Sequence, residues 1–196
     1  MKTENHPLKI SQILSLIFTL FSASVMLAQT YTLNNDASKL SVFGTSSLHD
    51  WEMVAEQKSG SISLNTTAET PSISALNLKV VAESLESGKS GMDKNAYKAL
   101  KTDDHKSIDF KMVDIQSITS KGNGVYAVKT TGNLTIAGTT KTITLNFNLT
   151  LTDNKVKLNG NYTFKMTQFK VEPPTAMFGT ITTGDELKIE FNIVLQ

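Results

Sequence analysis

Alternation of apolar and polar residues is the feature that most constrains the fold of this chain. From Val156 to Met166 every second residue is apolar or glycine, and lysine, asparagine or threonine fills the positions between them. Residues 143–151 and 187–195 follow the same pattern. A period of two places the apolar side chains of an extended segment on one face. These segments therefore predict β-strands with one buried face.

Shorter alternating segments account for much of the remaining sequence, at residues 40–42, 62–64, 76–80 and 108–112. Sequences typical of turns separate the segments, namely Ser59-Gly60, Gly122-Asn123-Gly124, Ala137-Gly138, Asp153-Asn154 and Thr183-Gly184-Asp185. About eight strands joined in this way favour a closed antiparallel barrel, with a sandwich as the alternative. The pattern alone therefore predicts an all-β, antiparallel fold of about eight strands, and it leaves the barrel and the sandwich open.

One segment departs from the strand pattern and predicts a short helix. Ser90 is a candidate N-cap, and Asp93 lies three residues later, at the spacing of a capping box. Met92, Ala96 and Leu100 then fall on one helical face. We expect a helix over residues 93–101.

The first 28 residues have the order of a secretory signal peptide. Lysines precede an apolar run from Ile10 to Phe21, and small residues follow it up to Ala28. A membrane anchor is the alternative, but this run is shorter than the roughly 20 apolar residues that span a bilayer. We expect residues 1–28 to be removed, leaving a single domain at residues 29–196 that is periplasmic or secreted.

Composition excludes several classes of function. The chain has 19 basic and 18 acidic residues, and every basic residue is lysine. Removal of the predicted signal peptide would remove Lys2, Lys9 and Glu4, so the remaining chain would carry no net charge. A neutral chain without arginine argues against a nucleic-acid partner. The absence of cysteine removes disulfides, thiol catalysis and cysteine-based zinc sites. We expect no metal and no cofactor.

Catalytic motifs are also missing. His49 and His105 each lie near aspartates, but no second histidine at metal-binding spacing supports a metal site. No serine occupies a G-x-S-x-G elbow and no phosphate-binding glycine loop occurs. We therefore expect both histidines in solvated loops, with His49 at the barrel mouth as an alternative, and no enzymatic activity.

The predicted strands are long enough to enclose a ligand. An 11-residue strand such as the one beginning at Val156 extends roughly 35 Å, and with the usual tilt a barrel would stand about 25–30 Å tall. A barrel of eight strands either fills its interior with side chains or holds one small ligand. Alternation by itself favours the filled interior.

Four segments of the chain resemble the sequence motifs of one known protein family. Residues 38–43 and 46–51 resemble its opening hairpin, and residues 80–85, 87–88, 92–93 and 99–101 its block of strand, turn and helix. Residues 107–110 resemble the strand after that helix, and residues 132–141 match its G-x-L-T-x-x-G-x-T-K hairpin. The family is the YceI-like family of exported bacterial proteins, and the likeness spans roughly residues 31–195. The resemblance implies an all-β, antiparallel, eight-stranded lipocalin-like barrel. An Arg-Ser-x-Phe-Gly stretch common in the family is replaced here by residues 167–174, which contain no arginine.

The resemblance implies that a polyisoprenoid-type or other amphiphilic lipid occupies the barrel. The apolar strand positions predicted to form the wall around it are Val42, Leu64, Leu78, Phe110, Met112, Leu134, Leu145, Phe147, Phe164, Met166, Ile189 and Phe191. Trp51 and Phe169 are candidates for the rim, and a cluster of Met166, Phe169, Met177 and Phe178 around Pro173-Pro174 predicts a lid or rim loop.

Two alternatives to the lipid carrier remain at the level of sequence. One is a cell-envelope structural or interaction module with a filled core and no ligand, and the other is a hydrolase whose residues converge only in space. The oligomeric state is open, a homodimer included.

Overall fold

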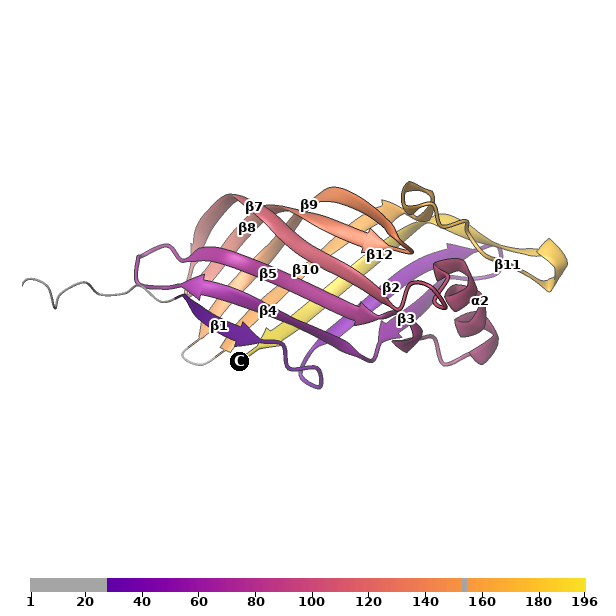
Figure 1. Cartoon of the computed structure of the whole chain (residues 1–196), viewed down its shortest axis with the longest axis horizontal. Helices are drawn as coiled ribbons and strands as arrows, with labels where there is room; N and C mark the ends of the chain where they lie inside the picture. Colours follow the sequence, from indigo (N-terminus) through magenta and orange to yellow (C-terminus); the bar gives the residue numbers. More distant parts are fainter. Residues whose placement is uncertain (1–27, 153–154) are drawn as a thin grey trace, which may run out of the picture.

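The computed structural model describes residues 28–152 and 155–196, and within them strands dominate and one α-helix occurs (Figure 1). The strands are β1 (Gln29–Thr32), β2 (Lys39–Ser46), β3 (Trp51–Ala55), β4 (Lys58–Asn65), β5 (Ser72–Val81), β6 (Leu85–Glu86), β7 (Ser107–Gly122), β8 (Val125–Ile136), β9 (Thr139–Thr152), β10 (Lys155–Lys165), β11 (Thr175–Ala176) and β12 (Ile181–Leu195). The helices are α2 (Ser90–Leu100) and the 3₁₀ turns η1 (Ala82–Ser84), η2 (Met166–Phe169) and η3 (Met177–Gly179). The predicted signal peptide and the turn at Asp153-Asn154 lie outside the described residues, apart from Ala28. Among the residues described, no helix combines the length and apolarity needed to cross a membrane.

The strands form one curled antiparallel sheet. Its order is β1-β4-β5-β7-β8-β9-β10-β12-β2-β3-β6, and β11 pairs only with β12. The predicted antiparallel architecture with one helix is confirmed, but the predicted count of eight strands is wrong. The four additional strands, β1, β3, β6 and β11, are between two and five residues long. Such segments hold too few residues for a period of two to stand out.

The sheet closes on itself at one end through residues next to β1 and β12. Leu33, just after β1, forms a bridge with Leu195 of β12. The Thr32 amide donates to the Gln196 carbonyl at 3.0 Å, and the Gln196 amide donates to the Thr32 carbonyl at 2.9 Å. We call this the closed end. Helix α2 and the β11–β12 hairpin lie at the opposite end, the α2 end (Figure 1).

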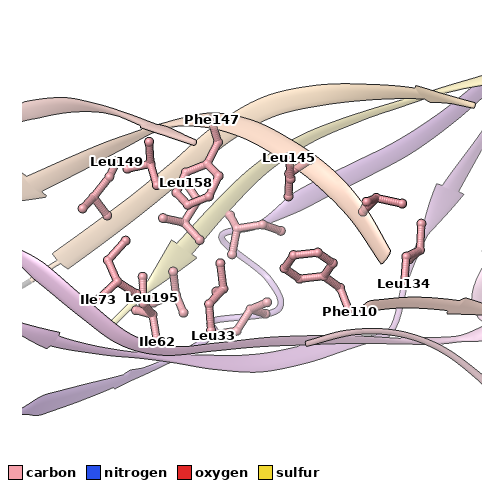
Figure 2. Close-up of a cluster of buried hydrophobic side chains, with 14 of the residues drawn as sticks. Leu33, Ile62, Ile73, Phe110, Leu134, Leu145, Phe147, Leu149, Leu158 and Leu195 are labelled. Carbon is pink, nitrogen blue, oxygen red and sulfur yellow. The ribbon is translucent and has the colours of Figure 1, made fainter. Parts of the chain in front are cut away.

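The closed end has a solid core. Its side chains are almost completely shielded from solvent and come from strands on all sides (Figure 2): Ile62, Leu64, Leu76, Leu149, Val156, Leu158, Ile193 and Leu195. They occupy alternate positions, as the periodicity of the sequence predicts. A core of this size supplies stability without disulfides.

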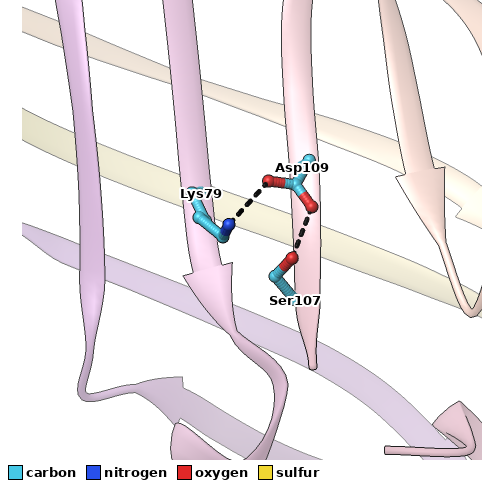
Figure 3. Close-up of polar contacts among 3 residues, drawn as sticks. All are labelled: Lys79, Ser107 and Asp109. Carbon is cyan, nitrogen blue, oxygen red and sulfur yellow. Dashed lines mark hydrogen bonds and ion pairs between the residues drawn. The ribbon is translucent and has the colours of Figure 1, made fainter. Parts of the chain in front are cut away.

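The outer face of the sheet is polar. Lys79 of β5 and Asp109 of β7 are paired across the strands, with Nζ 3.9 Å from Oδ1, and Ser107 Oγ donates to Asp109 Oδ2 at 2.6 Å (Figure 3). Both charged side chains are about half exposed, so the ion pair contributes little to stability. This face confirms the alternation of buried and solvated positions.

Helix α2 is confirmed, but it starts three residues before the predicted position. Lys89 is the N-cap, so the capping role predicted for Ser90 is wrong. The Asp93 carboxylate instead accepts hydrogen bonds from the Ser87 amide at 2.8 Å and from the Ser87 hydroxyl at 2.6 Å. Asp93 therefore fixes the turn between β6 and the helix. The helix ends where Lys101 adopts a left-handed conformation, with φ 53°.

Candidate ligand cavity

A cavity of about 390 Å³ lies at the α2 end, between the helix and the inner face of the sheet. Most of its lining is apolar: Val42, Leu48, Trp51, Met53, Leu85, Met92, Ala96, Ala99, Leu100, Ile108, Ile136, Phe164, Met166, Phe169, Val171, Pro174, Ala176, Ile181, Leu187 and Ile189. The remaining lining residues are Ser46, His49, Lys89, Gly91, Asn95, Thr175 and Thr183. Its volume falls in the range of roughly 300–1,000 Å³ that small-molecule sites occupy.

Helix α2 forms one wall of the cavity with a single apolar face. Met92, Ala96, Ala99 and Leu100 follow the i, i+4, i+7, i+8 spacing that aligns side chains along a helix. The two alanines leave room where larger side chains would fill the space. The Tyr97 hydroxyl donates to the Leu85 carbonyl at 3.0 Å, which ties the helix to β6. Burial raises the pKa of the Tyr97 phenol, and the negative charge of the nearby Asp93 carboxylate raises it further.

The mouth of the cavity is marked by the lining residues that solvent reaches: Leu48, His49, Lys89, Gly91 and Thr175. His49 Nδ1 lies 2.7 Å from the Asp50 carbonyl oxygen, which orients the ring. His49 and Lys89 place their polar groups beside an otherwise apolar opening. A molecule with an apolar chain and a small polar end could place that end here, next to solvent and these polar groups.

Trp51 is held in the wall by a glycine on the neighbouring strand. Gly44 and Trp51 are direct cross-strand partners, and a Cβ at Gly44 would lie 2.2 Å from the indole ring. The Trp51 indole N–H donates to the Thr45 carbonyl at 3.0 Å. The ring therefore covers Gly44 with its polar atom satisfied, and it leaves an apolar surface for the cavity.

The cavity ends at a common level across the sheet, which we call the floor. On β7, Ile108 lines the cavity and Phe110, the next inward residue, does not. The same step occurs from Ile136 to Leu134 on β8 and from Ile189 to Phe191 on β12.

Two rings of the floor lie over glycines. A Cβ at Gly132 would lie 2.3 Å from the Phe110 ring, and one at Gly160 would lie 2.9 Å from the Phe191 ring. The glycines let these rings lie across the neighbouring strand, at the level where the cavity ends.

A loop that follows β10 closes one side of the cavity. Met166 and Phe169 of this loop are buried and line the cavity. The Phe169 ring lies edge-on to the Phe164 ring, with 5.2 Å between the ring centroids. The Asp185 carboxylate accepts hydrogen bonds from the Thr167 amide at 3.0 Å and from the Thr167 hydroxyl at 2.7 Å. These two bonds lower the pKa of Asp185 and fasten η2 to β12.

The structure divides the predicted ligand-contacting residues between the two ends. Val42, Trp51, Phe164, Met166, Phe169 and Ile189 line the cavity. The others lie in or against the packed core instead: Leu64, Leu78, Phe110, Met112, Leu134, Leu145, Phe147 and Phe191. The predicted lid cluster also separates, because Met177 and Phe178 point into solvent.

Sequence reasoning missed the whole contribution of α2 to the cavity. The signal was available, since Met92, Ala96 and Leu100 were recognisable as one apolar face that needed a partner surface. Met53, Leu85, Ile108 and Leu187 gave no comparable signal, because an inward position on a strand looks the same whether it is packed or lines a space.

The polar side chains around the cavity come from separate elements: Ser46, His49, Lys89, Asn95, Thr175 and Thr183. Among residues 28–152 and 155–196, no group of three or more histidines and carboxylates is placed to hold a metal ion. His105 does not line the cavity; a Cβ at Gly138 would lie 2.5 Å from its ring, so it packs beneath that turn. The arrangement is suited to holding an apolar molecule.

The model of the YceI-like domain matches residues 31–195. The chain belongs to the YceI-like family. No curated protein sequence gives a significant match.

Solved structures share the YceI-like fold at low sequence identity. BcnA from Burkholderia cenocepacia has a TM-score of 0.65 at 18% identity, with 84% of this chain and 99% of BcnA covered. A polyisoprenoid binding domain from Saccharophagus degradans, implicated in plant cell wall breakdown, has a TM-score of 0.67 at 14% identity, with 87% and 98% covered. The YCEI protein of Campylobacter jejuni has a TM-score of 0.55 at 18% identity, with 72% and 82% covered.

Proposed function

We propose that this YceI-like domain binds the apolar chain of a polyisoprenoid-like or other amphiphilic lipid in the cavity at the α2 end. The observation that carries the proposal is an apolar space of about 390 Å³ that opens to solvent beside a few polar groups. Each methylene group transferred from water into such a space gains about 0.8 kcal/mol. The relative from Saccharophagus degradans, described as polyisoprenoid-binding, supports the ligand class. The proposal assigns no catalytic role to the cavity.

The cavity also determines how the ligand would be oriented. Its floor is formed by Phe110, Leu134 and Phe191, which offer no hydrogen-bonding group to a guest. His49, Lys89 and Asn95 lie among the lining residues toward the helix and the mouth. A bound lipid would therefore place its chain end against the floor and its polar end at the mouth.

The closed end favours a second candidate function. Its solid core resembles that of a ligand-free structural or interaction module, as the alternation in the sequence first indicated. In that case the cavity would hold no ligand in the cell. The experiment that follows distinguishes the two functions.

The test compares two phenylalanine substitutions on α2. Ala96→Phe projects a ring into the cavity, whereas Lys94→Phe places the same ring on an exposed position of the same helix. We expect native mass spectrometry and organic extraction to find an apolar lipid with the wild type and with Lys94→Phe, and none with Ala96→Phe. A wild-type protein that neither carries nor accepts an apolar ligand would refute the proposal and support the ligand-free module.

We also propose export to the periplasm or the medium. The order of basic, apolar and small residues over residues 1–28 supports it. Cell fractionation with N-terminal sequencing tests it. A processed chain that begins near Gln29 outside the cytoplasm is the expected result, and an unprocessed cytoplasmic chain would contradict it.

A further inference from the structure

The mouth carries exposed apolar side chains on the tips of two loops. Leu48, between β2 and β3, is 67% exposed, and Met177, between β11 and β12, is 70% exposed. Its neighbour Phe178 is completely exposed. Isolated apolar residues at a surface are ordinary, but three beside one opening call for an explanation.

The two loops are joined into one unit, which we call the mouth tips (residues 46–49 and 175–182). The Ser47 amide donates to the Thr182 carbonyl at 2.9 Å, and the Thr182 amide donates to the Ser47 hydroxyl at 3.1 Å. The Thr183 amide also donates to the Pro174 carbonyl at 3.2 Å, which braces the hairpin at its base. Leu48, Met177 and Phe178 are therefore presented together at the α2 end.

The backbone at the hairpin tip is unusual for bulky residues. Met177 and Phe178 have φ values of 50° and 56°, in the left-handed region that such residues rarely adopt. The Thr180 amide donates to the Met177 carbonyl at 3.2 Å and closes this turn. A strained conformation that holds two apolar side chains in solvent is typical of a functional contact.

The hairpin that carries Met177 and Phe178 suits a lipid bilayer. Residues 173–184 contain no charged side chain, so their insertion among lipid headgroups would strip water from no charge. Leu48, Ala176 and Ile181 of the mouth tips also line the cavity, so apolar surface continues from the tips to the interior. A second protein fits less well, since a stable protein interface uses roughly 20–30 residues on each side.

We infer that the mouth tips insert Leu48, Met177 and Phe178 into the surface of a lipid bilayer and dock the cavity mouth on it. The docking goes beyond the proposed function, because it depends on the outer surface of the tips and not on what the cavity holds. It would let an apolar guest move between membrane and cavity without crossing water.

The test is co-sedimentation of the protein, without residues 1–28, with phosphatidylcholine vesicles. We expect the wild type to sediment with the vesicles at both low and high salt, because apolar insertion is not screened by ions. The double substitution Met177→Ser with Phe178→Ser should lower partitioning at least about tenfold. Val113→Ser removes a residue that is 60% exposed on β7, beyond the floor residue Phe110, and should leave binding unchanged.

Further measurements separate docking from its alternatives. A wild type that stays in the supernatant, or an equal loss with Val113→Ser, would overturn the inference. Sedimentation velocity tests whether the tips mediate self-association instead. If the wild type self-associates, and the double substitution abolishes this but leaves vesicle binding unchanged, the inference is also overturned. Uptake of a detergent-dispersed apolar probe should be equal in the wild type and the double variant. Loss of both properties would show that the substitutions damage the cavity, and would remove the case for a separate docking surface.

Discussion

At the scale of single residues, the interior is organised by pairs of a glycine and an aromatic ring. Gly44 lies beneath Trp51, Gly132 beneath Phe110 and Gly160 beneath Phe191. In each pair the missing Cβ makes room for a ring that lies across the neighbouring strand. One ring forms part of the cavity wall and the other two form its floor, so the glycines determine the shape of the cavity without contacting a ligand.

Replacing Gly44 with alanine should displace the Trp51 ring. The new Cβ would lie 2.2 Å from the indole, and overpacking of this kind costs about 1–3 kcal/mol of stability. We expect a lower midpoint in urea, a shifted fluorescence maximum of this sole tryptophan and weaker uptake of an apolar probe. Gly91→Ala is the matched control, because a Cβ there meets nothing within 4 Å. Equal stability of the two variants would contradict the packing of Trp51 against Gly44.

The hydrogen bonds from Thr167 to Asp185 predict a pH dependence. They lower the pKa of Asp185 in the folded state, so the carboxylate stabilises the fold above the ordinary aspartate value of about 3.9. This contribution is lost as the pH falls through the lowered value. We expect Asp185→Asn to reduce the Tm at pH 7 and the difference from wild type to shrink below about pH 4. A difference that stays constant down to pH 2 would contradict this role of the carboxylate.

At the scale of elements, the cavity ends at the floor residues of β7, β8 and β12. These residues should limit the length of the apolar chain that can bind. Phe110→Leu removes a floor ring, and Phe147→Leu makes the same change in the packed core on β9. We expect both to lower stability, but only Phe110→Leu to shift binding toward longer chains. Competition between apolar alcohols of increasing length measures the preference. An unchanged preference in Phe110→Leu would place the end of the cavity elsewhere.

The sequence predicted the elements better than the space between them. Alternation identified the long strands, and it assigned Val156 and Leu158 correctly to the inner face. It could not separate Ile136, which lines the cavity, from Leu134, two residues away, which forms the floor. Both are inward positions on β8, and their difference depends on how closely the opposite side of the barrel approaches. That distance is a property of the tertiary fold and leaves no mark on local periodicity.

At the scale of the whole molecule, stability and binding are assigned to opposite ends. The closed end holds most of the large side chains that are almost completely buried, although Phe169 beside the cavity is one of them. Helix α2 has no fully buried residue and forms one wall of the cavity. A solid core at one end can support an unfilled space at the other. Regions with few buried contacts open more readily than the core, so the two ends should also differ in dynamics.

Hydrogen exchange should reveal this division and its response to a ligand. Amides of α2 should exchange faster than those near Ile62 of β4 and Leu158 of β10, which lie in the closed-end core, because local opening of the helix exposes little buried surface. An apolar ligand contacts the inner face of α2 and should slow exchange there, while the closed-end strands change little. In Ala96→Phe the ring fills the same space, so added ligand should have no such effect. Protection that rises equally across the molecule, or that rises in Ala96→Phe, would mean that the ligand binds somewhere other than the cavity at the α2 end.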